Sequence, residues 1–188
     1  MMRILLSTNG SPQSARALEL GARVAQNAAS TVDILVVNKH NQEGEAWPIA
    51  QATAAALELA GIPVTIHRRT GKLADEVVAQ AQAVPYDLAV IGSRGRRGLV
   101  QRLLGSVAQR VTAHALASVL VIKGRDRDLK RFLVCSSAGP ASERTVRFAG
   151  RLARALDASL TLLHVMSQLP LTEDAATDDL EASAEELI

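Results

Sequence analysis

The sequence contains very few aromatic residues and only one cysteine, and both shortages limit what the protein can be. Phe, Trp and Tyr make up 2% of the 188 residues, so few side chains are present on which nucleic-acid bases could stack. Cys135 cannot form a disulfide within the chain, and its apolar surroundings predict a buried thiol. The chain has no apolar run of membrane-spanning length, and Met1 leads into a strand-like segment rather than a secretory leader. We therefore expect a cytoplasmic protein with no membrane partner.

Aliphatic side chains are abundant, and charge is distributed unevenly. Hydrophobic residues make up 48% of the chain, which is enough for a sizeable core. Because aromatic residues are so few, that core must be built from Ala, Val, Leu and Ile, as in helices packed on a buried parallel sheet. The net charge is +2, but residues 171–188 contain seven acids and no bases. The rest of the chain therefore carries 21 bases and 12 acids, and such a basic body favours anionic ligands.

Short aliphatic runs alternate with helical segments in the first two thirds of the chain. A helix is predicted to begin after Ser11, a good N-cap that is followed by proline. The predicted strands are 3–8, 32–37, 63–67, 87–91 and 119–123, and the other predicted helices are 45–60, 73–83 and 105–117. This alternation indicates an α/β fold with a doubly wound parallel sheet.

The sequence then begins again after a charged linker. Residues 131–166 align with residues 3–38 without a gap, and nine of the 36 positions are identical. We interpret this as an internal duplication, with a domain at 1–123, a linker at 124–130 and an incomplete second copy at 131–188. The second copy has a predicted helix start near Glu181 but no counterpart of strands three to five. It must pack on the first domain, pair with another chain or belong to a truncated product, and the sequence leaves these alternatives open.

A segment rich in glycine and arginine, Gly92 to Ser106, follows the fourth strand. Ligands of doubly wound sheets bind beyond the strand ends where the strand order reverses, here between strands one and four. Glycine lets the backbone approach a phosphate closely. A helix is predicted to begin at Gly105, and Ser106 is placed to cap its start. The free N–H groups of a helix start can bind an anion. The segment is neither a P-loop nor a Rossmann fingerprint. The residues alone leave two interpretations open, a phosphate cradle and a tightly packed loop with solvated arginines.

Gly92, Gly95, Gly105 and Ser106 have the spacing G-x2-G-x9-G-[S/T], and the segment resembles the nucleotide-binding motif of the universal stress protein family. The flanking sequences DLAVIGSRG, LLGSV and ASVLVI are also similar to that family, and the similarity spans residues 2–123. The resemblance implies a five-stranded parallel sheet of order 3-2-1-4-5, like that of adenine nucleotide alpha hydrolases, followed by a partial second copy.

The resemblance also implies a binding site for ATP, or for AMP or ADP, with Mg²⁺ accompanying the nucleotide. The family usually has Asp where this chain has Asn9, which keeps an acceptor oxygen but loses the charge. We expect one site per chain, because the second copy has Ser137 at this position and lacks the phosphate loop. By position, Ser7, Thr8 and Asn9 would face the adenosine, and Val37 would offer backbone groups to the adenine. Gly92, Arg94 and Gly95 would border the ribose and first phosphates, and Ile91 is a further expected binding residue. Gly105, Ser106 and Val107 would bind phosphate.

The leading hypothesis is a regulatory stress-response module that binds an adenine nucleotide and forms a homodimer through the edge strand Val119 to Lys123. Slow ATP hydrolysis is an alternative, but no water-activating base is evident and Asn9 removes the best acid. A nucleotide-free structural dimerisation protein is another alternative. Nucleic-acid binding is supported only by the density of arginines.

Overall fold

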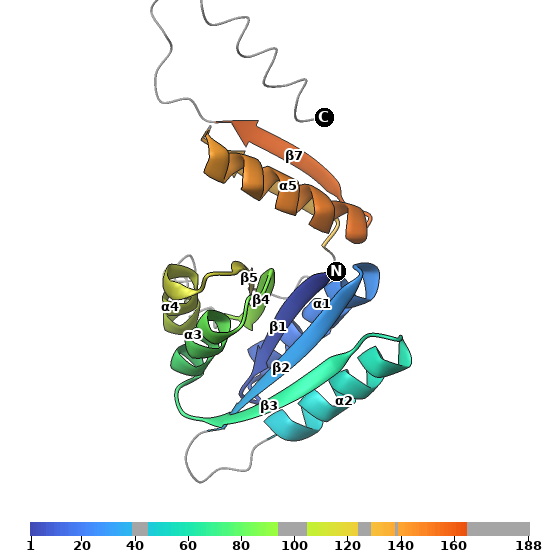
Figure 1. Cartoon of the computed structure of the whole chain (residues 1–188), viewed down its shortest axis with the longest axis vertical. Coiled ribbons are helices and arrows are strands. Elements are labelled where there is room, and N and C mark those ends of the chain that lie inside the picture. Colours follow the sequence, from blue (N-terminus) through green and yellow to red (C-terminus); the bar gives the residue numbers. More distant parts are fainter. Residues whose placement is uncertain (39–44, 94–104, 124–128, 138, 165–188) are drawn as a thin grey trace, which may run out of the picture. The chain divides into compact units, whose positions relative to one another are not determined.

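The computed structural model describes residues 1–38, 45–93, 105–123, 129–137 and 139–164 (Figure 1). The chain divides into two compact units, residues 1–130 with 155–157 and residues 131–154 with 158–188. The first unit contains β1 (Met2–Thr8), α1 (Pro12–Asn27), β2 (Ser30–Asn38), α2 (Ala46–Leu59), β3 (Val64–Thr70), α3 (Leu73–Ala83), β4 (Leu88–Gly92), α4 (Ser106–His114) and β5 (Ser118–Ile122). Within the described ranges, no helix is long and apolar enough to cross a membrane.

The five strands of the first unit form one parallel sheet in the order β3-β2-β1-β4-β5, so the predicted α/β fold is confirmed. Helices α1 and α2 contact each other over one part of the sheet, and α3 and α4 contact each other over another (Figure 1). The order reverses between β1 and β4, which are hydrogen-bonded neighbours although they are far apart in the sequence. Helix α4 ends at His114, three residues before the predicted end.

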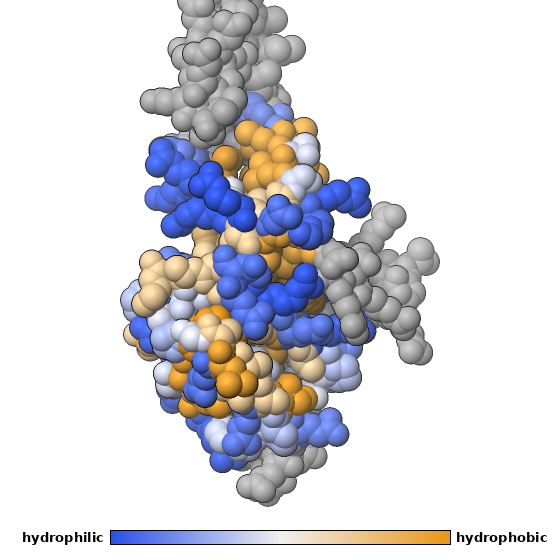
Figure 2. All heavy atoms as spheres, turned by 90° about the vertical axis from the view of Figure 1, so that its right-hand side faces the viewer, coloured by the Kyte–Doolittle hydropathy of each residue, from blue (hydrophilic) through white to orange (hydrophobic). Residues whose placement is uncertain are grey.

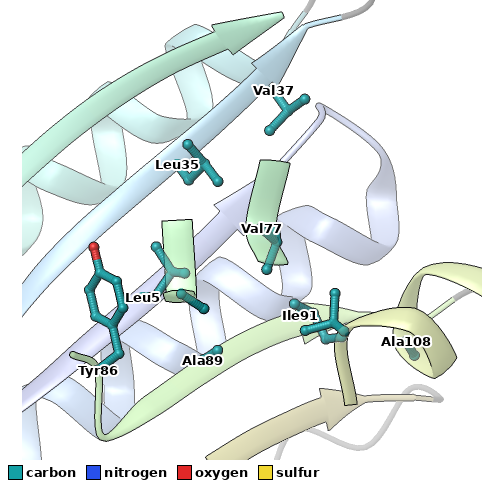
Figure 3. Packing of buried hydrophobic residues seen from close by; sticks show 10 residues of the cluster. Leu5, Leu35, Val37, Val77, Tyr86, Ala89, Ile91 and Ala108 are labelled. Carbon is teal, nitrogen blue, oxygen red and sulfur yellow. The ribbon is translucent and has the colours of Figure 1, made fainter. Parts of the chain in front are cut away.

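One layer of the core of the first unit lies between the sheet and helices α3 and α4, and another lies between the sheet and α1. Leu5 and Leu35 are 1% and 0% exposed, and they meet Val77 of α3 and Ala108 of α4 (Figure 3). Helices cover the sheet on each side, and β1, β2 and β4 accordingly have buried aliphatic side chains on both faces. Alanine at position 108 allows α4 to approach the sheet closely, so a core with few aromatic residues still fills its volume.

A buried carboxylate interrupts the aliphatic strand β2. Asp33 is 5% exposed, and its Oδ2 accepts hydrogen bonds from the Tyr86 hydroxyl at 2.5 Å and from the Arg3 guanidinium at 2.9 Å. The Gln80 amide donates to the Tyr86 oxygen at 2.9 Å, and His67 Nε2 lies 3.7 Å from Asp33 Oδ1. These contacts compensate the desolvated carboxylate and link β1, β2, β3 and α3.

The phenol of Tyr86 gives this network a measurable pH dependence. Burial and the hydrogen bond to Asp33 raise the pKa of Tyr86 from 10.0 to about 12. The folded state therefore holds this proton more tightly than the unfolded state, and we expect a loss of roughly 2–3 kcal/mol of stability as the pH rises from 10 to 12. Tyr86 is the only tyrosine, so phenolate absorbance in a pH titration reports this residue alone. In Tyr86→Phe the free energy of unfolding should change less between pH 10 and pH 12 than in wild type. A phenolate transition near pH 10 in the folded wild-type protein would contradict the prediction.

The second unit repeats the start of the first. It contains β6 (Arg131–Ser136), α5 (Pro140–Ala155) and β7 (Ser159–His164), and the β6–β7 register matches the β1–β2 register at an offset of 128. The turn repeats as well, because the Ser137 N–H donates to Ser142 Oγ at 3.1 Å as the Asn9 N–H donates to Ser14 Oγ at 3.4 Å. The structural repeat matches the sequence repeat, whereas the predicted helix start near Glu181 lies outside the described residues.

One face of the second unit differs from its counterpart in the first. Leu133 and Leu163 are 64% and 46% exposed, whereas the matching Leu5 and Leu35 are 1% and 0% exposed. Figure 2 shows this unit with apolar surface among polar side chains. The predicted burial of Cys135 is wrong, because Cys135 lies on the same exposed face. In the first unit α3 and α4 cover this face, and the described part of the second unit contains no counterpart of either helix.

Candidate functional site

Short polar side chains build the turn between β1 and α1. Ser11 is the N-cap of α1, and its Oγ accepts the Ser14 N–H at 3.3 Å. Thr8 Oγ1 accepts the Gly10 N–H at 3.1 Å, and Asn9 Oδ1 accepts the Ser11 N–H at 3.2 Å. Gly10 has φ +78°, a conformation in which glycine avoids the strain of a side chain. The turn therefore holds Asn9 in a defined position at the carboxyl end of β1.

The end of β4 lies directly against the first turn of α1. A Cβ on Gly92 would lie 2.3 Å from the Gln13 carbonyl oxygen and 2.9 Å from the Ser14 nitrogen. Both atoms belong to the backbone, so a side chain at position 92 would push the helix away from the strand. The first glycine of the motif thus has a packing role, which is to bring the end of β4 beside the β1–α1 turn.

Ser93 joins the two ends of the glycine-rich segment. Its side chain is buried, its N–H donates to the Ile122 carbonyl at 2.9 Å, and its Oγ accepts the Gly105 N–H at 3.1 Å. The start of α4 is therefore fixed beside the ends of β4 and β5. The sequence analysis did not select Ser93, and the predicted site residues Arg94 and Gly95 lie outside the described residues.

The first turn of α4 has backbone N–H groups that no described side chain caps. Gly105 is the N-cap and Ser106 is the first helical residue, so the prediction that Ser106 caps the helix is wrong. The first bond within the helix runs from the Gln109 N–H to the Gly105 carbonyl at 2.9 Å, which leaves the N–H groups of Ser106 and Val107 without helical partners. The first turn contains no acidic residue. Helix starts of this kind attract anions.

The other predicted site residues are buried beneath this edge of the sheet. Ser7 is 2% exposed, with its hydroxyl 3.5 Å from the Val90 carbonyl, and Thr8 is fully buried. Ile91 and Val37 are 1% and 2% exposed, so their side chains belong to the core. The last β1–β2 pair joins Thr8 to the residue before Val37, and β2 continues beyond it. Val37 can therefore meet a ligand only through its backbone.

The amino-acid sequence of both units matches the model of a known protein family. The family model described as the universal stress protein family matches residues 1–123 and 128–187. The chain belongs to the universal stress protein family. The two matched segments cover most of the two units, which agrees with the repeated register and turn.

Individual universal stress proteins show how far the similarity extends. A curated relative from Mycolicibacterium smegmatis is 32% identical over 138 residues, which are 65% of this chain and 46% of the relative. Another from Methanocaldococcus jannaschii is 41% identical over 63 residues, which are 34% of this chain and 37% of the relative. The chain thus spans less than half the length of these two relatives.

Solved structures of the family share the fold. A universal stress protein from Archaeoglobus fulgidus superposes with a TM-score of 0.68 at 21% identity, covering 98% of this chain and 73% of its own. A universal stress protein solved in complex with cAMP has a TM-score of 0.54 at 23% identity, covering 66% of this chain and 98% of its own.

Proposed function

We propose that the first unit of this universal stress protein binds an adenine nucleotide, ATP, ADP or AMP, as a regulatory module in the stress response. The observation that supports this most is the uncapped first turn of α4, which Ser93 fixes beside the end of β4. Gly92 brings the Asn9 turn to the same place. Family membership adds support, since one member of the same fold was solved with cAMP.

In the proposed complex the phosphates lie at the N–H groups of Ser106 and Val107. The helix dipole and the free donors stabilise negative charge there without any acidic side chain in the first turn. Asn9 faces the adenosine, and the Val37 backbone, beyond the last β1–β2 pair, offers polar groups to the adenine. Ser7 and Thr8 support the turn from below, and Arg94 and Gly95 complete the site beside the ribose and first phosphates.

The proposed partner, besides the nucleotide, is a second copy of the chain, and the proposed location is the cytoplasm. Strand β5 is an edge of the sheet, with β4 on one side only, and its first four residues are exposed or partly exposed. An open edge strand is a template for pairing with another strand. In this proposal the segment Val119 to Lys123 forms the dimer contact, and bound nucleotide changes the dimer's affinity for other proteins.

The test is to identify any nucleotide released from the denatured protein, and then to measure thermal stability with ATP, AMP and GTP. A ligand that binds only the folded state at a hundred times its Kd adds about 2.7 kcal/mol of stability. We expect the adenine nucleotides to raise Tm by several degrees, and Gly105→Leu, which crowds the first turn of α4, to abolish the shift. Gln109→Leu adds the same side chain farther along the same helix and should keep it.

Two results would contradict the proposal. One is a purified protein that contains no nucleotide and whose Tm does not respond to ATP or AMP. The other is a shift of the same size in wild type and Gly105→Leu, because the nucleotide would then bind away from the start of α4.

A further inference from the structure

The β1–α1 turn determines which way the amide of Asn9 points. The Ser11 backbone N–H, which can only donate, lies 3.2 Å from one amide atom of Asn9, so that atom must be Oδ1. The Ser14 hydroxyl lies 3.2 Å from the same oxygen. Nδ2 is therefore the end of the amide that remains for a ligand. Asn9 is exposed, and Nδ2 has no hydrogen-bond partner within the described ranges of the chain.

The start of α4, at the same edge of the sheet, also offers hydrogen-bond donors. The first turns of α1 and α4 contain no acidic residue, and the N–H groups of Ser106 and Val107 point out of α4. Within the described ranges, no three His, Cys, Asp or Glu side chains come together in a way that could hold a metal ion. Such a set of donors suits an anion.

A magnesium ion does not fit the same set. Mg²⁺ requires oxygen ligands in an octahedral arrangement, and an amide nitrogen cannot act as one. The oxygen of Asn9 already accepts the Ser11 N–H and is held inside the turn. An aspartate at this position would keep that bond with one oxygen and would present a second, charged oxygen where Nδ2 now lies. Position 9 therefore decides whether this edge of the sheet offers a donor or a metal-binding acceptor.

We propose that Asn9 makes the nucleotide site of this chain independent of magnesium. Nδ2 donates a hydrogen bond to an oxygen of the first phosphate of a metal-free nucleoside phosphate, at the point where the adenosine that Asn9 faces joins the phosphates. Mg²⁺ weakens the binding of ATP, because it neutralises the phosphate charge that the donors at Asn9 and α4 attract. This inference rests on the proposed nucleotide site and specifies the form of the nucleotide that the site takes.

The test measures the Kd of ATP by titration calorimetry in EDTA and in MgCl₂, and the readout is the Kd in EDTA divided by the Kd in MgCl₂. For wild type we expect a ratio of one or less. For Asn9→Asp we expect free ATP to bind at least about tenfold more weakly, and Mg²⁺ to restore the loss. Ser137→Asp adds the same charge at the matching position of the second unit and should keep the wild-type ratio.

Each outcome separates the inference from the proposal on which it rests. If wild type binds ATP but the ratio is the same in Asn9→Asp, or if wild type needs Mg²⁺, the inference is overturned and the nucleotide site stands. If wild type binds no nucleotide in either buffer, both fail. The aspartate oxygen can accept the Ser11 N–H as the amide oxygen does, so Asn9→Asp should fold, and its thermal midpoint checks this.

Discussion

Replacing Gly92 with alanine is expected to destabilise the first unit by about 3 kcal/mol and to weaken nucleotide binding strongly. The added Cβ would lie 2.3 Å from the Gln13 carbonyl oxygen, so α1 must move away from β4. That movement separates the Asn9 turn from Ser93 and the start of α4. Trp47 in α2 is the only tryptophan, so its fluorescence in urea reports the unfolding of the first unit.

Gly61→Ala provides the matched control for this prediction. Gly61 has φ +77°, and a Cβ there would meet nothing within 4 Å. The substitution should cost about 1 kcal/mol through backbone strain alone and should leave nucleotide binding unchanged. Equal losses of stability in the two variants, or normal nucleotide binding by Gly92→Ala, would show that the contact between β4 and α1 does not hold the site together.

Replacing Asp33 with alanine is expected to lower the stability of the first unit by about 3 kcal/mol. The carboxylate accepts hydrogen bonds from the buried Tyr86 hydroxyl and from Arg3, and its removal leaves both donors without their acceptor. Urea unfolding monitored by the fluorescence of Trp47 measures the loss. The Tyr86 phenolate transition should also fall from pH 12 toward pH 10, because the hydrogen bond that helps to raise this pKa is gone.

Asp75→Ala removes a carboxylate from an exposed ion pair and serves as the comparison. Asp75 lies 2.9 Å from Arg110, and the two side chains are 39% and 59% exposed. Exposed pairs of this kind contribute about 0–1 kcal/mol, so the loss should be several times smaller than for Asp33→Ala. Similar losses in the two variants would mean that burial adds little to the Asp33 network.

Local sequence patterns were sufficient to predict the fold class. Aliphatic runs mark β1, β2, β4 and β5, Ser11 and Pro12 specify the start of α1, and the predicted bounds of α3, Leu73 to Ala83, are those observed. These features depend on residues that are close together in the chain, so they can be recognised in a single sequence without an alignment. The strand order and the role of each residue toward the nucleotide came from the family resemblance, which carries information from other sequences.

Contacts between distant segments could not be predicted in this way. Arg3, Asp33 and Tyr86 meet only after three distant segments of the chain have packed together, and no local pattern connects them. Ser93 bonds to Gly105, twelve residues away, and its position in the motif does not specify the residue type. The predicted burial of Cys135 was wrong for a different reason. A strand has the same pattern of apolar residues whether or not helices cover its second face.

The exposed face of the second unit affects how that unit responds to temperature. The heat capacity change of unfolding scales with the apolar area that is newly exposed to water. Leu133 and Leu163 already contact water in the folded unit, whereas Leu5 and Leu35 of the first unit do not. Per residue, we therefore expect the described part of the second unit to unfold with the smaller heat capacity change and the flatter stability curve. Two copies of the same strand-helix-strand motif in one chain should thus differ in their calorimetric behaviour.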